Sequence, residues 1–215
     1  MAALTQRAEK KRREIMEAAW KVFSLHGYER ASVDAIAAEC GASKATIYVY
    51  FSSKEELFVQ ASIERAKLIG EQFFLGFFSN ASIGEDLYAF GLQYLAEYVS
   101  SDLTEIYRLA SAEGKKLSFG VLLYESCFRP CWNSVANYLE KRLDPAVLFA
   151  GGGWTAAMHL RGLLDGDVLM RRAWGVDGPV DPEWAKGRAA AAVTAFLRIY
   201  APDEAALFAW NITQS

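Results

Sequence analysis

The sequence predicts an all-α protein, and three observations lead to this fold class. Apolar residues recur every three or four positions along most of the chain, which is the spacing of one face of a helix. Almost no stretch alternates apolar and polar residues as a half-exposed strand does. The interruptions contain residues that end helices, above all in the Gly- and Pro-rich stretch from Gly175 to Pro182, which predicts a loop.

The first helix is predicted from about Lys10 to His26. Its apolar side chains lie about one helical turn apart, at Ile15, Ala18, Ala19, Val22 and Phe23. The pattern stops at Gly27, because glycine readily takes the left-handed conformation that closes a helix.

Two short helices follow. Ser32 can cap the first, which ends at Gly41. Ser43 can cap the second, which runs to Phe51. Gly41 lets the chain turn sharply between them, because glycine accepts a positive φ that bulkier residues resist. Two short helices joined by such a turn form a helix-turn-helix.

The rest of the chain is predicted to be helical as far as Tyr200. After a start at Lys54, helices are expected at Phe58–Phe78, Gly84–Ser100, Thr104–Lys116, Ser118–Leu143, Pro145–Asp165 and Pro182–Tyr200. Pro130 lies inside the fourth of these. Because proline has no N–H to donate, we expect it to kink that helix or to split it in two.

The chain as a whole is slightly acidic, with 23 Lys and Arg residues, 26 Asp and Glu residues and a formal net charge of -3. A protein that binds nucleic acid over a generally basic surface is therefore excluded, and any such site must be local. One basic cluster lies near the N-terminus and comprises Arg7, Lys10, Lys11, Arg12 and Arg13. A solvated helix start without a partner is the alternative for this cluster.

The segment behind the turn carries the most specific motif. It runs Thr46-Ile47-Tyr48-Val49-Tyr50-Phe51, followed by Lys54 and Leu57, and it resembles the DNA-binding signature of the TetR family of transcriptional regulators. The resemblance implies an N-terminal three-helix DNA-binding domain at residues 1–54, with a basic N-terminal arm at 1–13. It also implies a larger helical domain for effector binding and dimerisation at 55–215, and a homodimer that binds a double-stranded, pseudo-palindromic operator.

The predicted contacts with DNA cluster around the second short helix. The N-terminal end of a helix in the major groove reaches base edges, and the candidates for this role are Ser43, Lys44, Ala45 and Thr46. Tyrosine, serine and lysine side chains can bind phosphate oxygens, and the candidates are Tyr48, Tyr50, Lys54 and, beside its capping role, Ser32. The resemblance assigns the same role to the two tyrosines and Lys54. Packing in the core is the alternative for the tyrosine rings.

A single helix-turn-helix makes few base contacts, so specific binding usually needs two of them related by a two-fold axis. The dimer is expected to form through the last two long helices, as the resemblance also implies. The predicted interface residues are Trp154, Ala157, Leu160, Leu163, Val193, Phe196, Leu197 and Tyr200. Packing of these helices inside one chain is the alternative.

The central helices are rich in large apolar side chains, most of which must form the core. Aromatic residues with scattered polar neighbours also suit a pocket for a small, largely apolar or aromatic effector, whose binding would release a repressor from its operator. The candidates for this pocket are Tyr94, Tyr98, Tyr107, Phe128 and Trp132. A helical dimeric scaffold, or a constitutive DNA-binding protein without an effector, is the alternative function.

The sequence offers little for catalysis. It contains two histidines and neither a phosphate-binding glycine loop nor a nucleophile elbow, so we expect neither enzyme activity nor a cofactor. Cys127 and Cys131 are four residues apart, but no histidine or third thiol is near them in sequence, and no metal site is expected. Since no apolar run resembles a signal peptide or could span a bilayer, the expected location is the cytoplasm.

Overall fold

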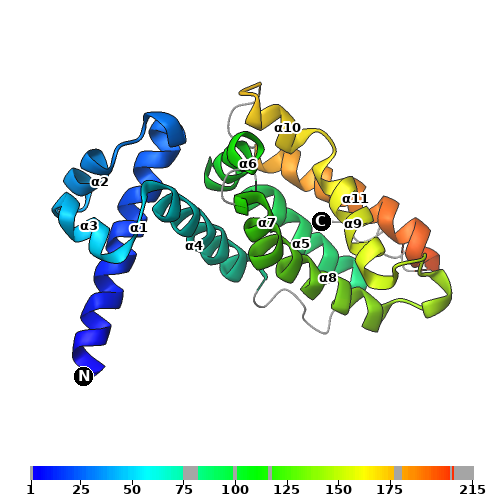
Figure 1. Cartoon of the computed structure of the whole chain (residues 1–215). Helices are drawn as coiled ribbons and strands as arrows, with labels where there is room; N and C mark the ends of the chain where they lie inside the picture. The colour runs from blue at the N-terminus through cyan, green and yellow to red at the C-terminus, as the bar shows by residue number, and fades with distance from the viewer. Residues whose placement is uncertain are drawn as a thin grey trace. The chain divides into compact units, whose positions relative to one another are not determined.

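The computed structural model describes residues 2–74, 82–98, 101–115, 118–176, 181–203 and 205, with the side chains of all of these except 2–5, 71–74, 97, 98 and 101. The described residues form helices and connecting loops without a strand (Figure 1), and the predicted all-α fold class is confirmed. They divide into two compact units, Met1–Ile69 with Glu105–Cys127 and Gly70–Thr104 with Phe128–Ser215. The functional boundary expected after residue 54 stays a prediction.

The N-terminal helices build most of the first unit. They are α1 (Ala2–Arg30), α2 (Val33–Glu39), α3 (Lys44–Tyr50) and α4 (Lys54–Phe74), of which α4 belongs to this unit as far as Ile69. α1 is interrupted at Gly27, whose φ of 72° and ψ of 166° are not helical, so the helical run stops where the sequence predicts. The core contains Phe23, Ile36, Ile47 and Leu57.

Residues 105–127 complete the first unit. They include most of α6 (Ser101–Glu113), α7 (Phe119–Leu123) and the beginning of a π-helical turn (Tyr124–Phe128). The Phe119 side chain is fully buried, and its ring lies 4.9 Å from that of Phe58 on α4. The Cys127 thiol donates to the Ile63 carbonyl at 3.7 Å. These contacts join the segment to α4.

The second unit is a set of packed helices. They are α5 (Ile83–Tyr98), α8 (Arg129–Arg142), α9 (Gly152–Asp165), α10 (Val168–Ala173) and α11 (Pro182–Tyr200). α9 packs against both α8 and α11, and α11 also packs along α5. Buried side chains of these helices, such as Phe90, Leu160 and Phe196, form one hydrophobic core.

Gly153 lets α9 approach α8 closely. A Cβ at this position would lie 2.3 Å from the Ala136 carbonyl oxygen and 2.5 Å from Glu140 Cγ. The Gly153 N–H also donates to Glu140 Oε1 at 3.0 Å. Glycine is therefore required here for packing inside the chain.

Pro130 follows an irregular turn in the long helix predicted at Ser118–Leu143. α7 ends at Leu123, the π-helical turn follows without a break, and Pro130 is the second residue of α8. The backbone is α-helical at both junctions, at Tyr124 and at Phe128, so the helix is not split in two. The expected irregularity takes the form of a π-helical turn, which is one of the usual causes of a kink.

The helix predicted at Pro145–Asp165 is wrong at its start. Residues Pro145–Val147 form a 3-10 turn, and α9 begins only at Gly152. The φ values of 96° at Gly151 and 57° at Gly152 lie in the left-handed region and delay the helix. α10 is absent from the sequence prediction, because its six residues are too few to show a helical period.

Two features are absent from the residues that the structure describes. No helix there combines the length and the apolar character that crossing a membrane requires. No three His, Cys, Asp or Glu side chains gather there in a way that could hold a metal ion.

Candidate nucleic-acid interface

Both short helices start at the predicted caps. Ser32 Oγ accepts the Ala35 N–H at 3.1 Å, and Ser43 Oγ accepts the Thr46 N–H at 3.0 Å. Each serine satisfies a backbone donor that the helix itself leaves unpaired. The positions at which α2 and α3 begin thus follow from two serines.

The turn between the two helices depends on Gly41, which has a φ of 60°. Its N–H donates to the Ala38 carbonyl at 3.4 Å, and the next N–H, of Ala42, donates to the Ala37 carbonyl at 3.0 Å. This pair of bonds closes a helix whose following residue is left-handed. A Cβ on Gly41 would have no atom within 4 Å, so the requirement for glycine is one of backbone conformation alone.

α3 buries little of its surface. Of its seven residues only Ile47 is buried, and Phe51 directly after it is 1% exposed. These two side chains anchor the helix. At the N-terminal end, Ser43, Lys44 and Ala45 are exposed and Thr46 is half-buried, so the residues predicted to contact bases lie on an open surface.

The two tyrosines of α3 lie outside the core. Tyr48 is 45% exposed and Tyr50 is half-buried. Among the described residues neither hydroxyl has a hydrogen-bond partner, which leaves both able to donate to a ligand. Sequence reasoning missed Val49, which is 81% exposed, because an apolar side chain carries no polar signal. It could contact a thymine methyl group.

Lys44 is paired on the surface. Its Nζ lies 2.9 Å from Asp34 Oδ2 on α2, and this hydrogen bond raises the pKa of the Lys44 ammonium. Exposed pairs of this kind contribute little to stability, because water and salt screen the charges. A stronger anion can therefore replace Asp34 at little cost.

Lys54 lies at the junction of α1 and α4. Its Nζ donates to the Glu29 carbonyl at 3.3 Å and lies 4.5 Å from the centre of the Tyr28 ring. The Tyr28 hydroxyl in turn donates to Glu55 Oε1 at 2.8 Å. The Glu55 backbone N–H, and after it this hydroxyl, lower the pKa of the Glu55 carboxyl. The Lys54 side chain is thus oriented by its neighbours and remains partly exposed.

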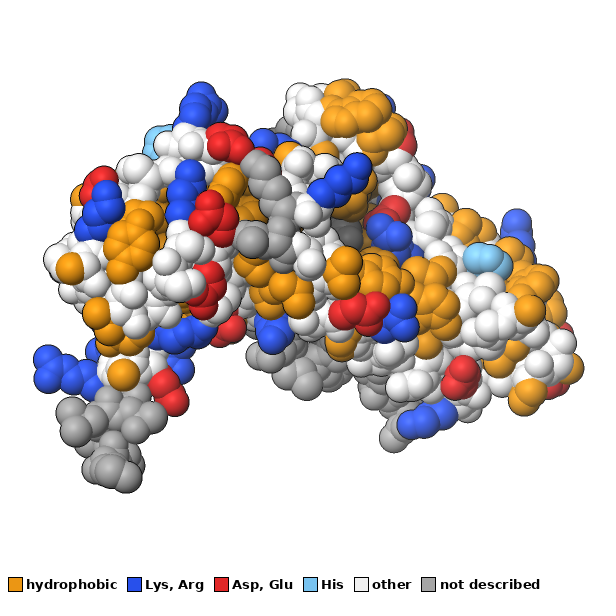
Figure 2. All heavy atoms as spheres, in the orientation of Figure 1, with side chains coloured by type: hydrophobic (Ala, Val, Ile, Leu, Met, Phe, Trp, Pro, Cys, Tyr) orange, Lys and Arg blue, Asp and Glu red, His pale blue; other side chains and the backbone are white. Residues whose placement is uncertain are grey.

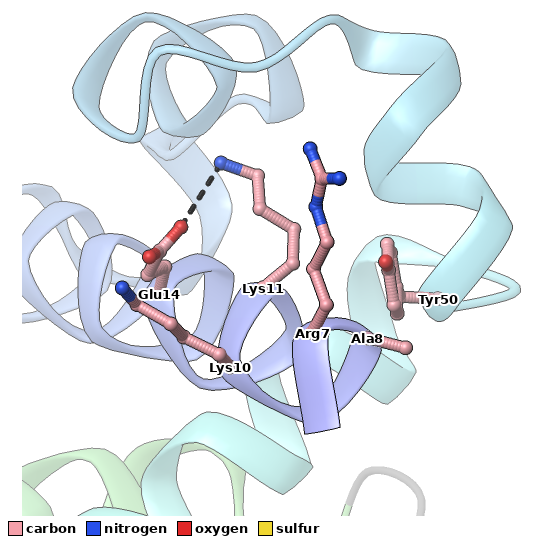
Figure 3. A pocket seen from close by; sticks show the side chains of 6 residues that line it. All are labelled: Arg7, Ala8, Lys10, Lys11, Glu14 and Tyr50. Atoms are coloured by element: carbon pink, nitrogen blue, oxygen red, sulfur yellow. Dashed lines mark hydrogen bonds and ion pairs between the residues drawn. The ribbon is translucent and has the colours of Figure 1, made fainter. Parts of the chain in front are cut away.

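The basic cluster lies on the first turns of α1 rather than on a separate extended arm. A hollow of about 580 Å³ lies beside it and is lined by Arg7, Ala8, Lys10, Lys11, Glu14 and Tyr50. Figure 3 shows Arg7 and Lys11 leaving the same side of α1, with Tyr50 across from them. Figure 2 shows Lys and Arg side chains gathered at this end of the helix.

Two cations of the cluster are bound within the chain. Lys11 Nζ lies 3.2 Å from Glu14 Oε2 and donates to the Cys40 carbonyl at 3.4 Å, at the end of α2. The Arg12 guanidinium lies 5.2 Å from the centre of the Phe51 ring and donates to Gln60 Oε1. Both residues therefore attach α1 to the helix-turn-helix.

The predicted dimer residues need correction. Six of the eight side chains are at most 1% exposed within the single chain, namely Ala157, Leu160, Val193, Phe196, Leu197 and Tyr200. Trp154 and Leu163 are partly buried against the same core. The intrachain alternative describes the six buried residues, because α9 and α11 pack on each other and on α5 and α8.

The predicted effector residues are distributed over different environments. Tyr94, Phe128 and Trp132 form an aromatic group in the second unit, with the ring of Trp132 5.5 Å from Tyr94 and 6.3 Å from Phe128. Tyr107 is 43% exposed and belongs to the first unit. The Tyr98 side chain lies outside the described residues.

A charged pair adjoins this aromatic group. The Tyr94 hydroxyl donates to Asp165 Oδ1 at 2.5 Å, and Arg161 Nη2 lies 2.8 Å from Asp165 Oδ2. The Arg161 guanidinium also lies 5.1 Å from the centre of the Phe128 ring. Burial raises the pKa of the Asp165 carboxyl, although Arg161 and Tyr94 act in the opposite direction.

Two family descriptions match the chain. Residues 15–61 match bacterial regulatory proteins of the tetR family. Residues 85–202, more than half of the chain, match the C-terminal domain of AefR-like transcriptional repressors. The first match covers the helix-turn-helix, and the second covers much of the second unit together with residues 105–127 of the first.

Curated relatives with partial matches to this chain are described as transcriptional regulators as well. The HTH-type transcriptional repressor SCO4008 from Streptomyces coelicolor is 45% identical over 69 residues, which are 32% of this chain and 34% of that protein. The curated relatives are aligned over only 17 to 34% of their own length.

Two solved structures resemble nearly the whole chain. A putative TetR-family transcriptional regulator from Mesorhizobium loti MAFF303099 has a TM-score of 0.82 and 27% identity, covering 90% of this chain and 98% of its own. The flavonoid-responsive regulator FrrA has a TM-score of 0.71 and 27% identity, covering 89% of this chain and 97% of its own.

Proposed function

The chain belongs to the TetR family of bacterial regulatory proteins, and from this premise we propose that it is a transcriptional regulator whose α2–α3 pair binds operator DNA. One observation carries the proposal. The polar and aromatic side chains of α3 lie outside the core, while Ile47 and Phe51 anchor the helix. A helix presented in this way can enter the major groove.

The side chains around α3 divide into two roles. Ser43, Lys44, Ala45 and Thr46 contact base edges, because they form the exposed N-terminal end of the helix. Tyr48, Tyr50, Lys54 and Ser32 contact phosphates and set the position of the helix on the duplex. Lys44 exchanges its surface pair with Asp34 for a contact with DNA.

The test is selection from a pool of random duplexes by the purified protein at fixed salt. We expect a pseudo-palindrome whose half-sites lie about one helical turn, 34 Å, apart. Lys44→Ala and Thr46→Ala should change the selected sequence, whereas Tyr48→Phe and Lys54→Ala should weaken binding to all sequences alike.

Lys186→Ala is the matched control for Lys44→Ala. Lys186 is also exposed and pairs with a carboxylate, Glu183, at 2.8 Å, but it lies on α11. It should leave the selected sequence unchanged. If the wild-type protein selects no sequence at all, the helical scaffold becomes the better description.

The protein acts as a homodimer through the faces of α9 and α11 that its own core leaves open. On α9 these include His159 and Gly162, which are exposed, and on α11 they include Ala191, Trp184 at 43% and Ile199 at 51% exposure. Hydrophobic side chains on the face shown in Figure 2 gather over this part of the second unit. Small and aromatic exposed residues suit close packing of two helix pairs.

The protein is a repressor that a small, largely aromatic effector releases from DNA. The aromatic group of Tyr94, Phe128 and Trp132, with the Asp165–Arg161 pair beside it, supplies apolar surface and a few polar groups, as ligand sites do. The description of FrrA as flavonoid-responsive supports an aromatic effector. α4 transmits the conformational change caused by the effector to the helix-turn-helix, because its backbone starts there and extends past Ile69 into the second unit.

The effector test starts from the purified protein. Small molecules that copurify are identified by mass spectrometry, and the affinity for a selected duplex is measured with and without them and with a series of flavonoids. We expect weaker binding to DNA with the effector present. Equal affinities with every compound would leave a constitutive DNA-binding protein.

A further inference from the structure

We propose that the hollow beside the first turns of α1 binds the sugar-phosphate backbone of DNA, with Arg7 and Lys10 as the phosphate ligands. The inference rests on the proposed function and extends the interface from the helix-turn-helix to a second surface on α1. The hollow is lined from α1 by the basic residues and from α3 by Tyr50 (Figure 3).

The cations of the basic cluster differ in whether they already have a partner within the chain. Lys11 and Arg12 have partners within the chain, at Glu14, Cys40, Phe51 and Gln60. Arg7 and Lys10 are exposed, and among the described residues neither makes a hydrogen bond or an ion pair. Two cations that border the same hollow are thus available for an anion, while their neighbours hold the helix in place.

Tyr50 connects this surface with the helix-turn-helix. Its hydroxyl has no partner among the described residues, and its ring borders the hollow together with Ala8. The Tyr50 hydroxyl can donate to a phosphate oxygen, while the Tyr50 ring and the Ala8 methyl group offer apolar surface to a deoxyribose. A backbone segment bound here would therefore contact α1 and the end of α3 at once.

The charge and size of the hollow fit a strand of DNA. Glu14 is the one carboxylate among the lining residues, and Lys11 neutralises it. Arg7 and Lys10 then leave the lining positive. The phosphates of one strand advance by about 3.4 Å each along the axis of the duplex, so a hollow of about 580 Å³ can take a stretch of backbone rather than a lone ion.

The experiment measures the affinity of Arg7→Ala, Lys10→Ala and Tyr50→Phe for a selected duplex and for a scrambled duplex over a series of salt concentrations. Each phosphate contact that is removed should make the slope of log affinity against log salt shallower by about 0.9, so a substitution present in both subunits should change it by about 1.8. Arg7→Ala and Lys10→Ala should show this for both duplexes with an unchanged sequence preference. Tyr50→Phe should weaken binding without a change of slope, because it removes no charge.

Arg13→Ala is the matched control, because Arg13 is an exposed cation of the same helix that does not line the hollow. It should change the slope less than either variant. Glu14→Gln should bind DNA more tightly, because it removes the carboxylate from the lining.

Two results would overturn the inference. Slopes of Arg7→Ala and Lys10→Ala equal to that of Arg13→Ala would reduce the hollow to a general charge effect. A changed sequence preference in Arg7→Ala would replace the phosphate contact by a base contact. A wild-type protein that prefers no duplex over the scrambled one would count against the proposed function instead, and the scrambled duplex alone would still test the hollow.

Discussion

α3 in the first unit and α11 in the second both carry aromatic and aliphatic side chains that the sequence assigns to a partner, but the chain treats them differently. α3 buries Ile47 and leaves Tyr48 and Val49 exposed, whereas α11 buries seven of its nineteen residues, Phe196 and Tyr200 among them. The motif of α3, with its polar residues at defined positions, therefore predicted an exposed surface correctly. The helical spacing of apolar residues in α11 showed only that one face of this helix is buried. That face is buried by other helices of the same chain and not by a second subunit.

The largest effect should come from shortening a buried side chain of α11. Phe196→Ala removes a ring with no exposed surface, and such changes destabilise a protein by about 3–5 kcal/mol. Urea unfolding should show this loss to a similar extent at every protein concentration, because the contacts lie within one chain.

Ala191→Arg tests the other face of the same helix. Ala191 is exposed, so the arginine should be tolerated by the monomer and should separate the dimer, as analytical ultracentrifugation would show. If Phe196→Ala instead separated the dimer and left the unfolding free energy unchanged, the assignment of the two faces would have to be reversed.

Two glycines sharpen the comparison, because each unit needs glycine for a different reason. Gly153→Ala forces a Cβ against backbone of α8 and should cost about 1–3 kcal/mol, as overpacking does. Gly41→Ala meets no atom within 4 Å but keeps a left-handed backbone at φ 60°, which should cost about 1–2 kcal/mol.

Asparagine separates the two causes, because it tolerates left-handed backbone and is larger than alanine. Gly41→Asn should recover part of the stability lost in Gly41→Ala, and Gly153→Asn should be worse than Gly153→Ala. Thermal unfolding of the four variants measures this. The same order at both positions would mean that one cause operates in both units.

Two tyrosines give a smaller contrast. Tyr94→Phe removes a buried hydroxyl that donates to Asp165, and the loss of such a bond costs about 1 kcal/mol. Tyr48→Phe removes a hydroxyl without a partner among the described residues, so stability should stay within about 0.5 kcal/mol of the wild type. Measured side by side, only Tyr48→Phe should weaken DNA binding in the absence of an effector. Similar stability losses in both would place Tyr48 in the core after all.

Much of the fold could be predicted because local chemistry determines it. Ser32, Ser43 and Gly41 act on backbone groups a few residues away, and the helix from Pro182 to Tyr200 was predicted with the bounds that α11 has. The delayed start of α9 could not be predicted, because glycine allows a helix as well as a left-handed conformation. Whether Gly151 and Gly152 continue a helix or take a left-handed conformation depends on tertiary contacts, such as the packing of Gly153 against α8.

The candidate site was predictable to a similar degree. The motif located the side chains of α3, because their spacing along one short helix already places them on one surface. The hollow needs Arg7 and Tyr50 to meet from distant parts of the sequence, and no local pattern contains that contact. The face of α11 that is covered by α5 and α9 likewise depends on tertiary packing.

The smallest effect concerns acid, where one carboxyl group of each unit should act in opposite directions. The hydroxyl and the backbone N–H of Ser52 donate to Glu56 and lower the pKa of its carboxyl. The stabilisation from Glu56 is therefore complete above its ordinary pKa of 4.5 and is lost as the pH falls through the lowered value. Burial raises the pKa of Asp165, so the stabilisation from its protonated form is present below 3.8 and is lost as the pH rises.

Urea unfolding from acidic to neutral pH should show that Glu56→Gln is less stable than the wild type near neutrality and that this difference vanishes in acid. For Asp165→Asn, the free energy of unfolding of the wild type should fall relative to that of the variant as the pH rises. The same trend in both variants would mean that the two carboxyl groups share one environment, against the contrast between an exposed carboxyl group at the start of α4 and a buried one in the second unit.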